Sequence, residues 1–348
     1  MIRLLQYKYN ILALLLCLLN SGTIHGEIQS YFFHYTTKEG LASNNVHDIV
    51  EDQHGFIWLA THYGISRFDG CSFRNYEQSN FPDMKRNDTY HAFKLPNGDI
   101  TFGGSNFTIY SYDYKDHNFH DISGFVPDEA HNSDITGCSI QPDGDCLLTS
   151  TGMGVFSYDK DANTFRQICA KIKDKKVLEV FKDFKGRYWL GGYGGVYVTD
   201  IEGNIQFDFR PRINELINNI LQIDPRHLLL CSNVGSLWMA DLNGDIPSIE
   251  KIPTPFRSVA SICKSSDNTI LLGTSGDGLW QTTYSDGKFT FDRIVPINKA
   301  DATMSKVSAI YVDSKKRAWI STNDNGVWCI NSMSDAKSFS SVELGIPK

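Results

Sequence analysis

The chain has 348 residues and a formal net charge of −7 at pH 7, from 33 Lys or Arg against 40 Asp or Glu. This acidic balance argues against a nucleic-acid partner, since nucleic-acid-binding proteins normally present a basic face. The length alone would suggest two domains, but the internal repeats described below indicate a single one.

The first residues have the features of a secretory signal peptide. Arg3 and Lys8 supply positive charge, residues 11–19 form a short apolar run, and Gly26 is a plausible cleavage position. The apolar run is too short to cross a membrane comfortably. We therefore expect residues 1–26 to be a signal peptide and the mature protein to have no membrane span. A membrane anchor and a lipid-modified Cys17 are the weaker alternatives.

Seven copies of one pattern follow between residues 41 and 330, and they recur roughly every 39 to 48 residues. Each copy starts with an alternating apolar stretch, passes through a turn rich in Asp, Asn, Pro and Gly, and continues in a second stretch that ends in two small residues. A third stretch carries an aromatic residue. The alternating stretches are 46–50, 89–95, 135–140, 177–181, 220–223, 259–263 and 307–312.

Repeats of this length, with three or four short strands each, are typical of β-propeller blades. We predict an all-β fold, a single seven-bladed β-propeller of four-stranded antiparallel blades over residues 27–348. The small pairs indicate close approach of neighbouring backbones, and the tryptophans are expected to fill the space between blades. The repeats lie near residues 41–76, 87–120, 135–168, 176–210, 217–252, 259–293 and 307–344.

Two segments compete for the fourth strand of the last blade. Residues 30–35 precede the first copy and resemble the fourth strand expected at 72–76, so they would close the ring by pairing with the last blade. Residues 338–344 have a similar pattern. One edge accepts only one of them, and the sequence leaves the choice open.

Seven cysteines remain after the expected cleavage. An odd number spread over strand positions indicates buried, small apolar side chains and not a disulfide framework. Cys138 and Cys146 flank one hairpin turn, so a bridge between these two is a minor alternative. The seven are Cys71, Cys138, Cys146, Cys169, Cys231, Cys263 and Cys329.

The common catalytic and metal motifs are missing from the sequence, including His-Glu-x-x-His, Cys-x-x-Cys, the nucleophile elbow and the P-loop. His117-x-x-His120 falls on a predicted blade edge, where this spacing does not suit a metal as it would on a helix. The run 241–252 begins like a calcium loop but lacks its central Gly and closing Glu. We predict no catalytic residue, no metal site and no cofactor.

A ligand site is expected on one face of the propeller. The turns between second and third strands emerge there with the connections between blades, around the central channel. Exposed aromatic rings beside amides and carboxylates suit a sugar, whose ring faces stack on tyrosine and whose hydroxyls bond to Asn and Asp. For each residue alone, ordinary turn chemistry is the alternative explanation. The candidates are His62, Tyr63, Arg86, Asn87, Tyr193, Arg257, Asp277, Asn323 and Asp324.

The first copy is specific enough to suggest a family. Its runs Gly55-Phe-Ile-Trp58-Leu-Ala-Thr61 and Gly64-Ile-Ser-Arg-Phe68 resemble the two-component regulator propeller repeat, and Trp189-Leu-Gly-Gly and Trp319-Ile-Ser-Thr agree with it. The resemblance covers nearly the whole mature chain. It implies the periplasmic sensor region of a hybrid two-component histidine kinase, especially of gut Bacteroidetes, that responds to oligosaccharides.

Such sensors also carry a membrane helix and a kinase core, and this chain has neither a phosphoacceptor box nor ATP-binding glycine boxes. We therefore predict no enzyme but a non-catalytic sensor propeller, the truncated sensor part of a hybrid two-component system. Its expected partners are an oligosaccharide or companion sensor domains, and a homodimer is compatible with the sequence. The alternatives are a protein-interaction scaffold without its own small ligand and, less favoured, a carbohydrate-active enzyme.

Overall fold

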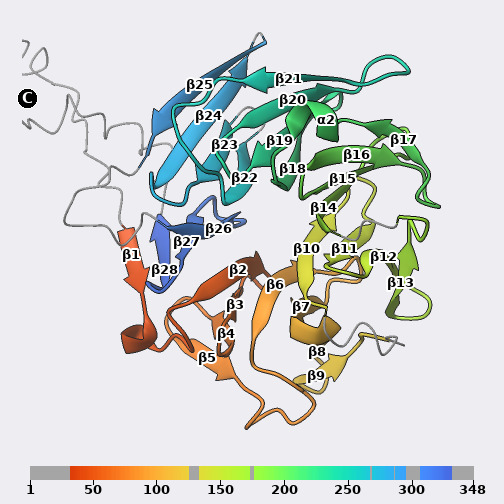
Figure 1. The fold of residues 1–348 in the computed structure, drawn as a ribbon. Helices are drawn as coiled ribbons and strands as arrows, with labels where there is room; N and C mark the ends of the chain where they lie inside the picture. Colours follow the sequence, from red (N-terminus) through yellow and green to blue (C-terminus); the bar gives the residue numbers. More distant parts are fainter. Residues whose placement is uncertain are drawn as a thin grey trace, which may run out of the picture. The chain divides into compact units, whose positions relative to one another are not determined.

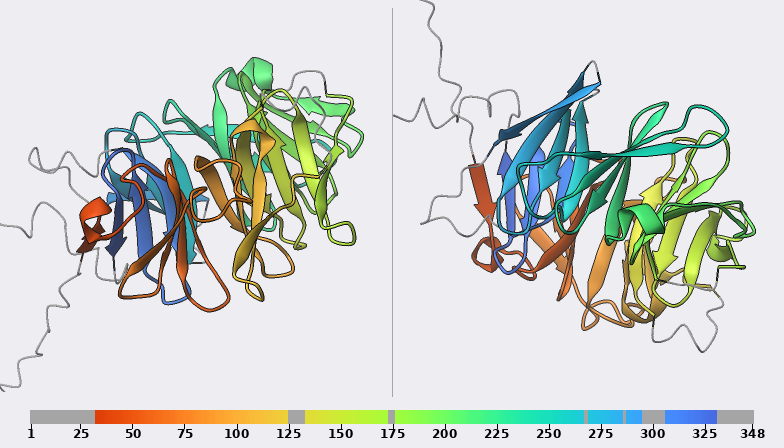
Figure 2. Two further views of the ribbon diagram at one scale, coloured as in Figure 1. Left: turned by 90° about the horizontal axis from the view of Figure 1, so that it is seen from below. Right: turned by 45° about the horizontal axis from the view of Figure 1, so that its top comes forward.

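The computed structural model describes residues 32–124, 133–172, 176–266, 269–285, 287–294 and 306–330. Over these residues the chain forms the predicted seven-bladed β-propeller, in which every blade is a four-stranded antiparallel sheet. Figure 1 shows one strand of each blade facing the axis of the ring, and Figure 2 shows the strands running between two faces. The expected signal peptide, residues 1–26, lies outside the described residues.

The strands fall into four concentric positions. The inner strands are β2 (Val46–Glu51), β6 (Thr89–Lys94), β10 (Ile135–Ile140), β14 (Val177–Lys182), β18 (Ile217–Asp224), β22 (Ser261–Ser266) and β26 (Val307–Val312). The second strands are β3 (Ile57–Thr61), β7 (Ile100–Gly104), β11 (Cys146–Ser150), β15 (Tyr188–Gly192), β19 (His227–Ser232), β23 (Thr269–Gly273) and β27 (Ala318–Thr322). The third strands are β4 (Gly64–Phe68), β8 (Ile109–Asp113), β12 (Gly154–Asp159), β16 (Gly195–Thr199), β20 (Leu237–Asp241), β24 (Leu279–Ser285) and β28 (Val327–Ile330). The outer strands are β5 (Phe73–Tyr76), β9 (Asn118–Asp121), β13 (Thr164–Ile168), β17 (Ile205–Asp208), β21 (Ser248–Ile252), β25 (Lys288–Arg293) and, for the last blade, β1 (Phe32–Tyr35).

Among the described residues, three short helical segments interrupt the connections. They are η1 (Thr37–Glu39), η2 (Ser105–Phe107) and α2 (Arg210–Ile213). The segment η2 occupies the turn before the third strand, where the other blades have a glycine at the start of the strand or within two residues before it. In blade 2, Asn106 takes the left-handed backbone instead, with a φ of 55°. This substitution explains why the second copy of the repeat lacks the usual glycine.

The core lies between the blades. Each inner strand packs against the inner strand of the next blade, and β26 packs against β2 to complete the circle. Every residue of β3 and of β15 is buried, because both faces of a second strand pack against neighbouring blades. Continuous apolar second strands follow from this packing, as in sheets that are covered on both sides.

The small residues at the ends of the second strands are required by close approach of the next blade. A Cβ atom on Gly273 would lie 2.4 Å from Cγ1 of Val307, and one on Gly191 would lie 2.9 Å from Cγ2 of Ile217. Both distances are far below van der Waals contact. The predicted close approach is therefore confirmed at these positions.

Three blades share a buried hydrogen bond between an aspartate in the first turn and a tryptophan six residues later. The indole Nε1 donates to the carboxylate in each, with Asp52 and Trp58 at 2.7 Å and Asp183 and Trp189, like Asp313 and Trp319, at 2.9 Å. The indole rings also pack between blades, as predicted. The aspartate thus ties the turn to the core and satisfies a polar group that burial would otherwise leave unpaired.

The strand β1 closes the ring. It pairs antiparallel with β28, so the segment before the first copy occupies the fourth position of the last blade. His34 stacks on Trp328 with ring centroids 4.0 Å apart, and its Nε2 lies 2.8 Å from the carbonyl oxygen of Asn325. The competing segment 338–344 lies outside the described residues.

The seven described cysteines are free. The sulfur atoms of Cys138 and Cys146 are 3.8 Å apart and not bonded, so the minor alternative of a bridge is wrong in this structure. Most of the cysteines are buried or half-buried, as expected. Cys71 is the exception, because it lies in the exposed turn before β5 and not in a strand.

Candidate functional site

The turns between second and third strands share one face of the ring with the connections between blades. His62 N donates to the carbonyl of Asn45 at 3.0 Å, Gly64 N to that of Asn87 at 2.8 Å, and Gly326 N to that of Asn44 at 2.7 Å. The last two bonds cross from one blade to the next. We call this side the ligand face, because all nine candidate residues lie on it.

Four candidates meet where blades 1 and 2 join. His62 and Tyr63 form the turn of blade 1, and 55% of Tyr63 is exposed. Arg86 and Asn87 come from the connection into blade 2; the Arg86 guanidinium lies 4.0 Å from the Asp88 carboxylate. The Asn87 side chain accepts a bond from the backbone of the same loop, so its role here is structural.

Two further candidates meet on blade 6. The backbone N–H of Arg257 lies 3.4 Å from the Asp277 carboxylate, and Arg293 Nε donates to the Asp277 carbonyl at 3.1 Å. Asp277 N in turn donates to Thr274 at 2.9 Å. These bonds stabilise the turn between β23 and β24. Asp277 therefore has the structural role that the alternative explanation assigns to a turn residue.

The other three candidates stand apart. Tyr193 is 56% exposed on blade 4, and Asn323 and Asp324 are exposed on blade 7. Among the described residues, none of these three side chains forms a hydrogen bond or an ion pair with the four candidates on blades 1 and 2. The structure therefore brings four of the nine candidates together at one blade junction and leaves the other five on blades 4, 6 and 7.

Sequence reasoning missed the residues beneath this junction. His47, Asp48, Tyr90 and His91 occupy the inner strands β2 and β6, and with His62 we call them the blade 1–2 cluster. The His47 ring lies edge-on to Tyr90 at 5.2 Å and to His62 at 6.2 Å.

A backbone irregularity places these side chains on the ligand face. The pairing of both inner strands shifts register at their start, between the first and third residues, which is the signature of a β-bulge. His47 and Tyr90 occupy the bulge positions of β2 and β6. One feature of the sequence could have identified the cluster: two consecutive copies of the repeat have polar residues where the inner strand begins.

The surroundings of His47 favour its neutral form. Burial, followed by the neighbouring His62 and His91, lowers the pKa of His47 to about 4, so its ring is uncharged at neutral pH. The His47 Nε2 atom is buried without a hydrogen-bond partner among the described residues. Asp48 accepts a bond from Ala92 N at 3.0 Å and lies 3.6 Å from His91 Nδ1.

A second carboxyl group occupies the equivalent register position on blade 4. Glu179 pairs with the second strand at the position that Asp48 has on blade 1. Burial, together with the charge of Asp48, raises the pKa of Glu179 to about 8. The only bond its carboxyl group accepts among the described residues comes from Val180 N at 3.3 Å. The inner strand of blade 4 thus carries a carboxyl group that burial keeps largely protonated at neutral pH.

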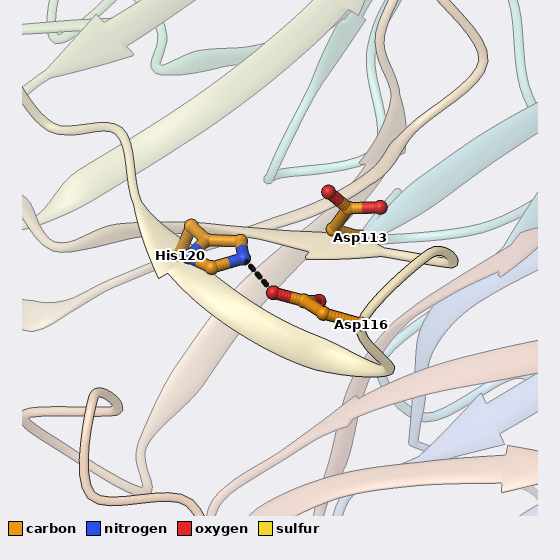
Figure 3. A group of neighbouring side chains, drawn as sticks. All are labelled: Asp113, Asp116 and His120. Carbon is orange, nitrogen blue, oxygen red and sulfur yellow. Dashed lines mark hydrogen bonds and ion pairs between the residues drawn. The ribbon is translucent and has the colours of Figure 1, made fainter.

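One exposed group of Asp and His side chains lies away from the ligand face. Figure 3 shows Asp113, Asp116 and His120 on the outer hairpin of blade 2, where their polar atoms lie within 4.8 Å of one another. His120 Nε2 is 2.8 Å from Asp116, while Asp113 accepts a bond from Lys115 N at 2.7 Å. His120 thus pairs with Asp116 and does not converge with His117, whose Nδ1 is 3.4 Å from the Tyr112 hydroxyl. These hydrogen bonds stabilise the tight turn of the hairpin, which explains why the three side chains lie close together.

Comparison with known proteins agrees with the propeller fold. Residues 40–63 match the model of the two component regulator propeller, which confirms the expected resemblance. A comparison with curated protein sequences gives no match. Among the described residues, no helix combines the length and apolar character needed to cross a membrane.

Similar solved structures include extracellular domains of two-component systems and a lyase. The extracellular domains of two proposed hybrid two-component systems of B. thetaiotaomicron align with TM-scores of 0.72 and 0.66, at 18% and 16% identity over 87% and 86% of this chain. The chain spans 42% and 39% of those structures. Virginiamycin B lyase from Staphylococcus aureus aligns with a TM-score of 0.65 at 15% identity, over 87% of this chain and 98% of its own. At these identities the likeness establishes the fold alone. The chain is thus a β-propeller that carries a two component regulator propeller repeat at residues 40–63 and resembles the extracellular domains of hybrid two-component systems.

Proposed function

We propose that this chain is the non-catalytic ligand-recognition propeller of a periplasmic sensor that responds to oligosaccharides. The observation that supports it most is the junction of blades 1 and 2, where the exposed Tyr63 follows His62 of the blade 1–2 cluster in the same turn. An exposed tyrosine offers a flat face to a sugar ring, and the histidine rings, the Asp48 carboxyl group and Arg86 offer hydrogen-bonding groups to its hydroxyls.

A binding role agrees better than catalysis with the state of the polar groups. The Asp48 carboxylate already accepts a backbone hydrogen bond, and Asp88 is bonded to the Ser105 hydroxyl and lies beside Arg86. These bonds hold the two carboxylates in fixed positions, as expected for polar groups that orient a bound ligand. The likeness to a lyase fold makes a turnover measurement a necessary part of any test.

The signalling step in this proposal needs further domains. The two similar extracellular structures are more than twice as long as the aligned part of this chain, since it spans 42% and 39% of them. We infer that ligand binding changes the packing between this rigid propeller and companion domains, as in other rigid-body transitions. Export through the expected signal peptide, residues 1–26, would place the propeller in the periplasm.

The test is a ligand screen with matched tyrosine variants. Purified mature chain is heated with assorted oligosaccharides, and a bound glycan raises the melting temperature. Tyr63→Ala should weaken binding of that glycan by about tenfold or more, which is about 1.4 kcal/mol. Tyr193→Ala is the matched control, since Tyr193 has nearly the same exposed fraction but lies on blade 4. Product analysis of each glycan after incubation checks for turnover.

Three results would contradict the proposal. A cooperative melt that no glycan moves would favour the interaction scaffold. Cleavage of a glycan would make the chain an enzyme. Binding that survives Tyr63→Ala but is lost in Tyr193→Ala would move the site away from blades 1 and 2.

A further inference from the structure

The face opposite the ligand face contains a pocket that the proposed function does not use. It has a volume of about 560 Å³, within the range of small-molecule sites. Its walls come from the turns between first and second strands, from one outer turn of blade 5, and from two inner strands. The lining residues are Pro142, Phe184, Gln222, Asp224, Pro225, Arg226, Asn243 and Lys264. Because four consecutive blades contribute, the pocket lies over the inner strands.

One wall is an aromatic ring held out to solvent. Phe184 is 62% exposed at the tip of the hairpin between β14 and β15. The hairpin is rigid, since the Asp183 carboxylate accepts Lys185 N at 2.9 Å and the buried Trp189 indole at 2.9 Å. The corresponding turns of blades 1 and 7 carry polar Gln53 and Ser314 after their aspartates. Turn formation therefore does not require a phenylalanine at this position.

The other wall is cationic. Lys264 Nζ donates to the Ile223 carbonyl at 3.1 Å, and the exposed Arg226 guanidinium has no side-chain partner among the described residues. The Asp224 carboxylate is already bonded to His227 Nδ1 at 2.7 Å and to Arg226 N at 2.7 Å.

The charge balance of the pocket differs from that of the chain. Two cations face the pocket against one engaged carboxylate, whereas the whole protein has a net charge of −7. A guanidinium and an apolar ring that line the same pocket suit planar anions, because the guanidinium can bond to both carboxylate oxygens.

We propose that this pocket binds a small organic anion with a carboxylate attached to a six-membered ring. The ring lies against Phe184, and the carboxylate accepts hydrogen bonds from Arg226 and Lys264. This chemistry is shared by aromatic acids and by uronic acids, whose apolar ring faces also stack on aromatic side chains. The site is on the opposite face from the blade 1–2 cluster and does not depend on the oligosaccharide proposal.

Calorimetric titration of the full mature chain with two pairs of probes tests the proposal. Benzoate is compared with the neutral benzamide, and glucuronate with the neutral glucose. At least one carboxylate should bind about tenfold more tightly than its neutral counterpart, and added salt should weaken it. Benzoate alone would identify an aromatic acid, and glucuronate alone a sugar acid.

Variants assign the binding to the pocket. Arg226→Gln and Phe184→Ser should each weaken the carboxylate by about tenfold; the serine is the residue that blade 7 has in the equivalent turn. Arg166→Gln removes an exposed arginine from the outer strand β13, away from both sites, and should change nothing. The proposal is overturned if neither carboxylate binds, if the neutral probes bind equally well, or if both pocket variants, shown to be folded by their melting curves, still bind.

Discussion

At the residue scale, Asp183 shows how one side chain fixes a blade. Its buried carboxylate accepts bonds from Arg187 Nε at 2.8 Å and from Trp189 Nε1 at 2.9 Å, and Arg187 is itself only 7% exposed. Asp183→Ala would leave a buried guanidinium and a buried indole without their partner. Loss of one member of a buried charge pair is strongly destabilising.

We expect Asp183→Ala to lower the free energy of unfolding by about 3 to 5 kcal/mol, measured by urea denaturation. Asp69→Ala is the control, because Asp69 also accepts two backbone bonds in a turn but is exposed. It should lower the free energy by less than about 1 kcal/mol. If both changes lowered the free energy of unfolding equally, the buried Asp183 network would stabilise the protein no more than an exposed turn does.

Glu179 should make stability depend on pH in a direction unusual for a carboxyl group. Its pKa is raised from 4.5 to about 8 by burial and by Asp48, so the folded protein keeps a proton that the unfolded chain has lost. Between these values the unfolded state binds fewer protons, and stability falls as pH rises. Glu179→Gln keeps a neutral side chain and should remove this part of the dependence.

The measurement is the free energy of unfolding at pH 5 and pH 8.5 for both proteins. The wild type should lose about 2 to 4 kcal/mol more than Glu179→Gln between the two conditions. Comparing the difference between proteins cancels the other titrating groups. Parallel pH profiles would mean that Glu179 is ionised in the folded state.

At the element scale, the repeat predicts the strands well because one packing constraint recurs in every blade. Alternation marks the inner strands, continuous burial marks the second strands, and small residues mark close approach, as at Gly191 and Gly273. The ring closure could not be predicted, because two segments had the same pattern and only long-range pairing distinguishes them.

The candidate site could be predicted only in part for the same reason. Turn residues such as Tyr63 stand out because tyrosine is not a turn-forming residue. His47 and His91 lie within strands, so the sequence gives no sign that β-bulges turn them towards a common junction. The contact between His47 and Tyr90 joins two different blades and has no local signature.

The closing strand β1 provides the element-scale prediction. Tyr35 packs on Trp319 of blade 7 and on Phe68 of blade 1, with ring centroids 6.1 and 5.0 Å apart. Tyr35→Ala should therefore lower the free energy of unfolding by about 3 kcal/mol, by leaving a cavity between the first and last blades. Phe33→Ala, on the same strand but at a 43% exposed side chain, should have a much smaller effect in the same denaturation experiment. Similar losses would argue that the closure depends on backbone pairing alone.

At the scale of the whole molecule, closure changes how the repeats unfold. Open repeat arrays unfold in steps, because each repeat contacts only its neighbours and the ends can fray. Here β26 packs on β2 and β1 pairs with β28, so the described blades form a circle without a free end. Removing any one blade from the circle exposes the apolar flanks of two others. We therefore expect the propeller to unfold in a single cooperative transition.

Tryptophan fluorescence and far-ultraviolet circular dichroism distinguish a single transition from a stepwise one. The six tryptophans lie on blades 1, 4, 5, 6 and 7, whereas blades 2 and 3 contain none. Fluorescence therefore reports on five blades and circular dichroism on all seven. Coincident urea curves are expected, and a dichroism loss that precedes the fluorescence change would show that blades 2 and 3 unfold first. That result would also place the proposed ligand junction in the least stable part of the ring, where a bound glycan would stabilise blade 2 more than the remainder.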